Sequence, residues 1–261
     1  YPAGLAVTSD SKRLVVADQL ADAVSVIDLA TNKIQTTHIG HRPVWVTLSK
    51  DSTKAFVSSQ GGADVAEVDI TKSQPLATHK INVDFHPNKS VLTPDGKSLY
   101  VANGDADTIS VVDVASHRQT ATIPVNRNGS KLVGANPTGL ALSQDGKRLY
   151  VTNSGHNEVA VINVATRKVI GDIPTGWYPT QVLAHGRKLS ITSAKGLGAG
   201  PNNGPNHPNP TDPHDTAENQ YSGSLIKGLL STVSEPDAAT LAKLTATVEK
   251  NNTANDPARS S

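Results

Sequence analysis

The sequence predicts an all-β protein, a β-propeller built from four-stranded antiparallel blades. A motif that begins at a proline returns along the chain, with spacings of 41, 44, 50 and 42 residues between successive copies. The repeated prolines are Pro2, Pro43, Pro87, Pro137 and Pro179. Each copy also holds short runs of β-branched residues separated by turn residues. This period and this pattern are typical of a propeller blade.

The fourth copy shows the elements of one blade in order. Its first strand is Gly-Leu-Ala-Leu at 139–142, and Asp145-Gly146 then forms a tight turn, because glycine accepts the positive φ that such a hairpin needs. The second strand is 149–153, the third is 159–163 and the fourth is 168–174. Hairpins of this kind require antiparallel pairing, which disfavours a solenoid of parallel coils.

The repeat divides the chain into four parts. Residues 1–195 hold about five blades, 196–220 form a loop rich in Gly, Pro and Asn, 221–235 supply the closing strands of the last blade, and 236–261 form a short helix and tail. Leu241, Leu244 and Val248 share one face, which predicts the helix, and Pro236 suits its first turn.

Composition excludes several classes of site. The chain has no Cys, which rules out disulfides, thiolate metal sites and cysteine nucleophiles. Its net charge is +1 with the basic residues spread along the chain, so we expect no nucleic-acid partner. No apolar run approaches the roughly 20 residues that span a bilayer, so we expect no membrane span. The sequence holds no glycine-rich phosphate loop and no Gly-x-Ser-x-Gly or His-x-x-x-His motif, and we expect no cofactor.

The segments around the repeated prolines are the candidate binding region. In a propeller the first strand of each blade lines the central channel, so these segments ring one mouth of the channel. Arg42, His86 and Lys89 would make this mouth basic and suited to an anion or a polar ligand. The predicted residues for binding a ligand or partner are Arg42, Trp45, His86, Lys89, Asn136, Trp177 and Tyr178. The alternative is structural, with these side chains merely hydrated or packed on the neighbouring blade.

Other polar residues have simpler interpretations. An Asp or Asn ends the third strand of each blade, and another ends the second strand in most blades; both are predicted to cap turns through their own backbone. The first group is Asp28, Asp69, Asp113 and Asn163, and the second is Asp18, Asn103 and Asn153. We predict no catalytic residue and no metal site. His207 and His214 are weak candidates for metal ligands, at a spacing that matches no dedicated site.

The second strands carry a family motif. Leu-Tyr-Val-Thr-Asn at 149–153 contains the signature that names the YVTN-repeat propellers, and Tyr-Val-Ala-Asn at 100–103 is a close variant. Residues 1–195 therefore resemble these lactonase-like propellers, which implies a ring of about seven blades. Five blades of such a ring would leave two apolar faces bare. Either the ring closes with five blades, or the partner is the chain's own missing blades or another protein chain.

A second resemblance covers the end of the chain. Residues 173–180, 194–202, 221–231 and 236–252 are similar to the closing region of a subset of these propellers, in which a phosphoesterase domain of the alkaline-phosphatase superfamily follows. Members of this subset are bacterial and usually exported, which implies a periplasmic or secreted location. The phosphoesterase domain is absent from this chain and would be a further partner, so we expect the chain to be part of a longer polypeptide.

Three functions are compatible with these observations. The first is a non-catalytic binding or scaffold module of an exported bacterial phosphoesterase-type protein. The alternative is a cell-surface or assembly propeller with a structural or adhesive role. The third function is a lactonase that acts at the channel mouth, as the family name suggests. It would need an Arg or His together with acidic groups, and the positions before the prolines supply Arg42 and His86 but no Asp or Glu. We expect this chain alone not to be an enzyme, although the resemblance implies a metal-dependent phosphoesterase as the parent protein.

Overall fold

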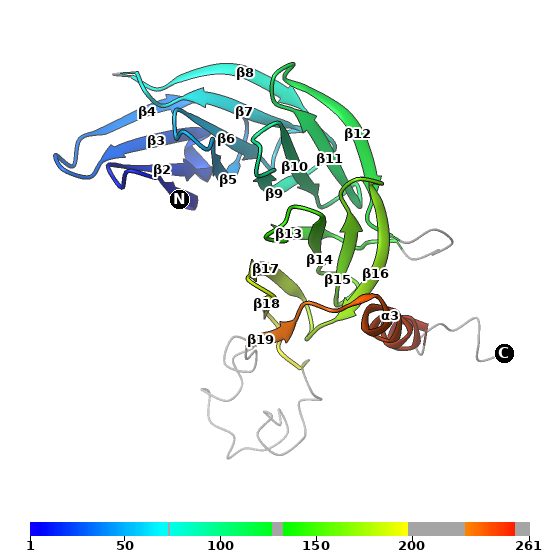
Figure 1. Ribbon diagram of the computed structural model, residues 1–261. Coiled ribbons are helices and arrows are strands. Elements are labelled where there is room, and N and C mark those ends of the chain that lie inside the picture. The colour runs from blue at the N-terminus through cyan, green and yellow to red at the C-terminus, as the bar shows by residue number, and fades with distance from the viewer. Residues whose placement is uncertain (73, 127–132, 198–227, 254–261) are drawn as a thin grey trace, which may run out of the picture.

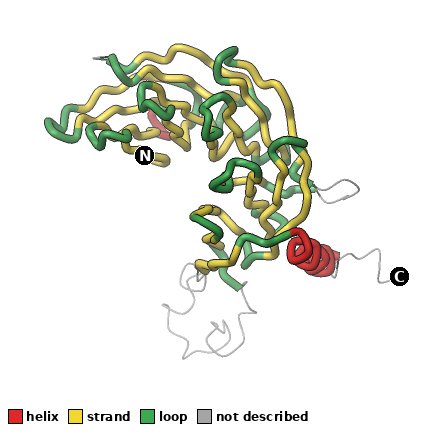
Figure 2. Tube along the Cα trace, viewed as in Figure 1, coloured by secondary structure: helices red, strands yellow, loops and turns green. Residues whose placement is uncertain are grey.

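The computed structural model describes residues 1–72, 74–126, 133–197 and 228–253. These residues form five antiparallel sheets that follow one another along an open arc, in colour order from blue to orange in Figure 1. Four sheets have four strands and the fifth has three, and in each the strands pair in chain order. Figure 2 shows that short turns and loops join most of the strands. The predicted propeller of about five four-stranded blades is confirmed.

The strands of each blade are given from the inner strand outward. Blade 1 comprises β1 (Pro2–Val7), β2 (Arg13–Asp18), β3 (Ala23–Asp28) and β4 (Ile34–His38), with a short 3-10 turn η1 (Gln19–Ala21) after β2. Blade 2 comprises β5 (Pro43–Leu48), β6 (Lys54–Ser59), β7 (Asp64–Asp69) and β8 (Leu76–Asn82). Blade 3 comprises β9 (Pro87–Leu92), β10 (Ser98–Asn103), β11 (Thr108–Asp113) and β12 (Arg118–Pro124). Blade 4 comprises β13 (Pro137–Leu142), β14 (Arg148–Asn153), β15 (Glu158–Asn163) and β16 (Lys168–Pro174). Blade 5 comprises β17 (Pro179–His185), β18 (Lys188–Ser193) and β19 (Leu229–Ser234).

The first strand of each blade lies on the concave side of the arc. Along this side β1 contacts β5, β5 contacts β9, β9 contacts β13 and β13 contacts β17 (Figure 1). These strands are therefore the channel wall that the repeat predicts.

The turn between the first two strands is built identically in blades 1 to 4. A Ser or Thr hydroxyl donates to the Asp carboxylate two residues on, at 2.6–2.7 Å, and the same carboxylate accepts the backbone N–H two residues further. These hydrogen bonds hold the pKa of each Asp below its ordinary value. The residue after the Asp has positive φ, as predicted from Asp-Gly, but in blades 1 and 2 it is Ser11 or Ser52.

The core consists of apolar layers, one between each pair of neighbouring blades. Successive side chains of a strand point to opposite faces, so each central strand contributes to two layers. In β7, Ala66 and Val68 belong to the layer shared with blade 1, whereas Val65 belongs to the layer shared with blade 3. Each blade thus buries its faces only against its neighbours.

The faces at the two ends of the arc carry exposed apolar side chains. Leu5 of blade 1 is 61% exposed, whereas Val46, at the same repeat position of blade 2, is 3% exposed. On blade 5, Leu183 is 63% exposed, whereas Ala141 at the same position of blade 4 is 8% exposed. Each end face therefore exposes an apolar side chain at a position that the neighbouring blade buries.

The helix α3 (Ala238–Thr253) packs on β16, the outermost strand of blade 4 (Figure 1). The carboxylate of Asp237 accepts the N–H of Thr240 at 2.7 Å, so Asp237 caps the helix and Pro236 lies before it, not in its first turn. The predicted apolar stripe is present, with Leu241 and Val248 buried.

The helix approaches β16 closely because Gly171 has no side chain there. A Cβ at Gly171 would lie 2.6 Å from Cγ of Leu241. The neighbouring N–H of Asp172 donates to the hydroxyl of Thr245 at 2.9 Å. Among the described residues, no helix is long and apolar enough to cross a membrane.

Replacing Leu241 by Ala is expected to lower the free energy of unfolding by about 2–5 kcal/mol, because the change removes buried methyl groups and leaves a cavity. Urea unfolding monitored by circular dichroism measures this loss. The matched control is Leu20→Ala, because the Leu20 side chain is 73% exposed, and it should change stability by less than about 0.5 kcal/mol. Equal effects of the two changes would contradict docking of α3 on blade 4.

Candidate functional site at the channel wall

The residues before the repeated prolines share one backbone conformation. Arg42, His86, Asn136 and Tyr178 have φ between 49° and 60°, in the left-handed region. The carbonyl of each accepts the N–H of the residue that follows the second strand of the same blade, at 2.9–3.1 Å. The turn by itself, without a ligand, explains why these residues have positive φ.

A second set of residues holds these turns to the preceding blade. Asp22 accepts the N–H of Arg42 at 2.8 Å, and this hydrogen bond, with a further one from His41, lowers the pKa of Asp22. Asp107 and Asn157 accept the corresponding N–H groups of the next turns, at 2.9 and 2.8 Å. Sequence analysis missed these three residues, although each lies four positions after the end of a second strand.

The first strands are irregular just after the proline, and this irregularity aims side chains at the channel. In blades 2, 4 and 5 the register with the second strand shifts between the proline and the residue two positions later. Trp45, Lys89 and Gln181 occupy this second position in blades 2, 3 and 5. With their neighbours they enclose a pocket of about 180 Å³, lined by Val44, Trp45, Asn88, Lys89, Thr138, Thr180 and Gln181.

Lys89 is the central group of this pocket. Its ammonium donates to the side-chain carbonyl of Gln181 at 2.9 Å and lies 4.9 Å from the ring centroid of Trp45. The second contact is a cation–π interaction, which stabilises the charged form without neutralising it. Burial lowers the pKa of Lys89 from 10.5 to about 8. The amine therefore remains a partly desolvated positive charge near neutral pH.

The polar neighbours of Lys89 are held by hydrogen bonds between blades and within blade 4. Asn88 donates to the carbonyl of Pro137 at 3.1 Å and accepts from Gln60 at 2.7 Å. The hydroxyl of Thr138 lies 2.8 Å from that of Ser154. None of the residues that line the pocket is Asp, Glu or His. The arrangement can hold an anion, and the amine of Lys89 is the only titratable side chain in its lining.

The other predicted residues lie outside this pocket lining. His86 and Asn136 meet beside Gly104, and the Nδ1 of His86 is 3.0 Å from the carboxylate of Asp105. Arg42 is exposed and lies beside Gly61.

The last two predicted residues lie in the loop before blade 5. Trp177 is 54% exposed, and the ammonium of Lys195 lies 4.7 Å from the ring centroid of Tyr178. His207 and His214 fall outside the described residues. Only Trp45 and Lys89 of the predicted set line the same pocket, and binding at the remaining positions stays a prediction.

The recurring Asp and Asn residues divide into two structural roles. Those that end the third strands cap the following turn, as predicted; Asp28, for example, accepts the N–H of Thr31 at 2.8 Å. Those that end the second strands were interpreted wrongly. Asn103 donates to Ser110, and Asn153 donates to Glu158, both across to the third strand. Asp18 accepts from Ser25 in the same way.

A larger hollow, of about 870 Å³, lies between the Asp-Gly turn of blade 4 and the start of α3. Several of its polar groups pair with one another. Arg148 donates to the carbonyl of Pro236 at 2.7 Å, and the hydroxyl of Tyr150 donates to Glu235 at 2.5 Å. Burial, followed by this hydrogen bond, raises the pKa of Tyr150. We interpret these contacts as interactions that hold the end of the last blade against blade 4.

Comparison with known proteins agrees with the fold. Residues 90–183 match the family model described as a lactonase, 7-bladed β-propeller. A seven-bladed β-propeller protein of Mycobacterium tuberculosis is 30% identical over 136 residues, which cover 46% of this chain and 34% of that protein. The chain thus spans about a third of the curated relative that it matches.

Solved structures give the same result. Hydrazine synthase of Kuenenia stuttgartiensis superposes with a TM-score of 0.64 at 23% identity, covering 73% of this chain and 55% of the other. Streptogramin B lyase superposes with a TM-score of 0.59 at 13% identity, covering 75% and 66%. At these identities the likeness shows the propeller fold alone.

The stability of the chain is expected to rise between pH 8 and 10.5, in part because of Lys89. In this window the folded chain, with its lowered pKa, binds fewer protons at Lys89 than the unfolded chain does, so raising the pH favours folding. Urea unfolding at several pH values measures the rise. Lys89→Met should reduce it, whereas the exposed control Lys33→Met should not. An NMR titration of Lys89 centred near 10.5 would contradict its desolvation.

Proposed function

We propose that this chain is a non-catalytic propeller module that binds a small anionic group at the channel wall. The observation that carries the proposal is the environment of Lys89. A desolvated ammonium, with one neutral hydrogen-bond acceptor and one aromatic face as its neighbours, gains much from an anion that approaches it.

Three features support a binding role over a catalytic one. The pocket of about 180 Å³ has room for a phosphate or carboxylate group beside the ammonium of Lys89. Its donors come from two blades, with Asn88 and Lys89 on β9 of blade 3 and Gln181 on β17 of blade 5. Its lining has no carboxylate or imidazole that could activate water.

We further propose that the module belongs to an exported bacterial phosphoesterase-type protein. The sequence resemblance at 173–180 and 236–252 supports this parent protein. The apolar end faces support additional blades, because Leu5 and Leu183 occupy positions that other blades bury. In such a protein the anion site would present or retain a phosphate-bearing group near the catalytic domain.

Isothermal titration with inorganic phosphate, methyl phosphate and succinate tests the anion site. We expect at least one of these to bind, and Lys89→Met to weaken that binding by at least tenfold. Affinity should also fall as the pH is raised above 8, because the ammonium loses its proton. Lys33→Met is the matched control and should bind as the original chain does. Equal binding by both variants would overturn the proposal, as would hydrolysis of a sugar lactone that Lys89→Met abolishes.

The parent protein is tested by the intact mass of the protein from its natural source. We expect a mass well above the 27.2 kDa of this chain, together with phosphatase activity that requires a divalent metal. A mass that matches this chain would contradict the parent protein and leave the anion site to be judged by the titration alone.

A further inference from the structure

Glu67 occupies a position that is apolar in the other complete blades. It lies in the third strand of blade 2, where blades 1, 3 and 4 have Val26, Val111 and Val161, each buried in the layer shared with the following blade. Glu67 is only 1% exposed. A buried carboxylate is costly unless other groups compensate its charge, so its surroundings at the junction of blades 2 and 3 call for an explanation.

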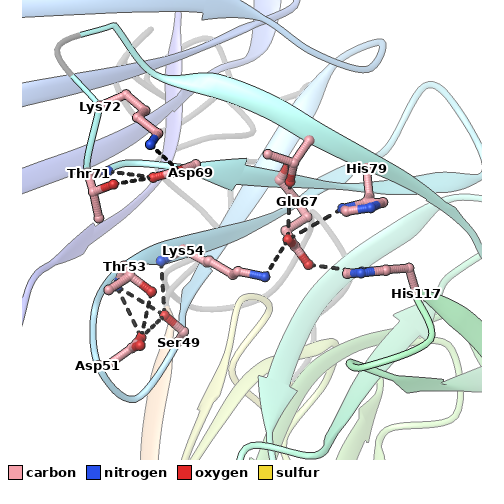
Figure 3. A network of polar contacts seen from close by, with 11 residues as sticks. Ser49, Asp51, Thr53, Lys54, Glu67, Asp69, Thr71, Lys72, His79 and His117 are labelled. Carbon is pink, nitrogen blue, oxygen red and sulfur yellow. Dashed lines mark hydrogen bonds and ion pairs between the residues drawn. The ribbon is translucent and has the colours of Figure 1, made fainter.

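Two histidines from different blades converge on this carboxylate, as Figure 3 shows. His79 is directly opposite Glu67 on the neighbouring strand β8, with its Nδ1 3.5 Å from Oε1. His117 comes from the turn between β11 and β12 of blade 3, with its Nδ1 3.1 Å from Oε2. The two imidazole rings are stacked, with centroids 3.6 Å apart and planes 8° from parallel.

The two oxygens of Glu67 have different environments. Oε1 accepts from the ammonium of Lys54 at 2.7 Å and from the hydroxyl of Thr78 at 3.1 Å. Oε2 is buried and, within the described part of the chain, accepts no hydrogen bond; the 3.1 Å contact with His117 is within ion-pair range but lacks hydrogen-bond geometry. Likewise, the Nδ1 of His117 is buried and forms no hydrogen bond within the described part of the chain. Two facing ligand atoms thus stand without the partners that buried polar atoms normally have.

The position of Lys54 leaves one oxygen of the carboxylate open. The Lys54 ammonium contacts Oε1 and leaves Oε2 without a hydrogen bond.

We propose that Glu67, His79 and His117 form a binding site for a divalent transition-metal ion of the zinc class, which fastens blade 2 to blade 3. Their ligand atoms all lie within 4.8 Å of one another, and the partly exposed ring of His79 must turn out of its stack on His117 for both Nδ1 lone pairs to point at one ion. Ligands of a tetrahedral zinc ion lie about 3.4 Å apart, given bonds of about 2.1 Å. Two imidazoles and one carboxylate are a donor set that zinc accepts. His79 is partly exposed, which gives the ion a route from solvent and room for a water ligand.

Titration of the 261-residue chain with Zn²⁺ in a non-chelating buffer tests the site, with Co²⁺ as a spectroscopic probe of tetrahedral nitrogen and oxygen ligands. We expect one ion per chain. At a Zn²⁺ concentration a hundredfold above Kd, we expect a rise in Tm of about 5–10 °C. His79→Gln and His117→Asn should each weaken binding by at least tenfold and lose this rise. His38→Gln is the matched control, because His38 lies exposed on the outer strand of blade 1.

A second variant keeps the proposal falsifiable if a histidine change disturbs folding. Glu67→Val installs the residue of the other blades, so it should fold with unchanged or higher Tm in the absence of metal and should show no Zn²⁺-dependent rise. The proposal is overturned if the original chain binds Zn²⁺ no more tightly than Glu67→Val does. It is also overturned if the Co²⁺ spectrum is the same in His117→Asn, which would make the cluster a metal-free network of Lys54, Glu67 and the two histidines.

Discussion

The apolar layers between neighbouring blades hold this structure together. A single four-stranded sheet has two apolar faces, and between neighbouring blades of this chain each face is covered by the next sheet along the arc. The third strands show the arrangement most directly, since Ala66 and Val68 face one neighbour and Val65 faces the other. The turns, the caps and the helix α3 follow from this constraint. The turns keep the strands in register. Asp22, Asp107 and Asn157 join the proline turns of blades 2, 4 and 5 to the blade before, and α3 covers the outer strand of blade 4.

A scaffold that repeats its backbone can change its chemistry one position at a time. The residue two positions after each proline is glycine in blades 1 and 4, but Trp45, Lys89 and Gln181 in the others. Where glycine stands, the inner strands touch closely: a Cβ at Gly4 would lie 2.5 Å from the carbonyl oxygen of Val44. Where larger residues occupy this position, their side chains line the pocket. Glu67 is a second example of a change at one repeat position. In the layer between blades 2 and 3 it replaces the valine of the other blades, and His79 and His117 contact it.

Much of the fold could be predicted because its signals are local. The proline period, the Asp-Gly turns and the helix stripe of Leu241 and Val248 all lie within a few residues of the elements that they specify. The candidate site was predicted only in part. Trp45 and Lys89 line one pocket, whereas Arg42 lies beside Gly61 and His86 faces Asp105. The sequence gives the repeat position of each residue, but not which neighbour its side chain reaches across the gap between blades.

The sequence by itself determined the architecture, the five blades within this stretch of chain and the position of the channel wall. These depend on periodicity and turn chemistry, which act over a few residues and recur in every copy. Only the tertiary structure decided which side chains meet. Lys89 and Gln181 are 92 residues apart, and Glu67 and His117 are 50 apart, yet each pair is in contact because the blades stack face to face. A motif search along the chain detects ligands that are close in sequence. The physical reason that it misses these pairs is that their proximity comes from the curvature of the arc and the spacing of its sheets, which no single repeat encodes.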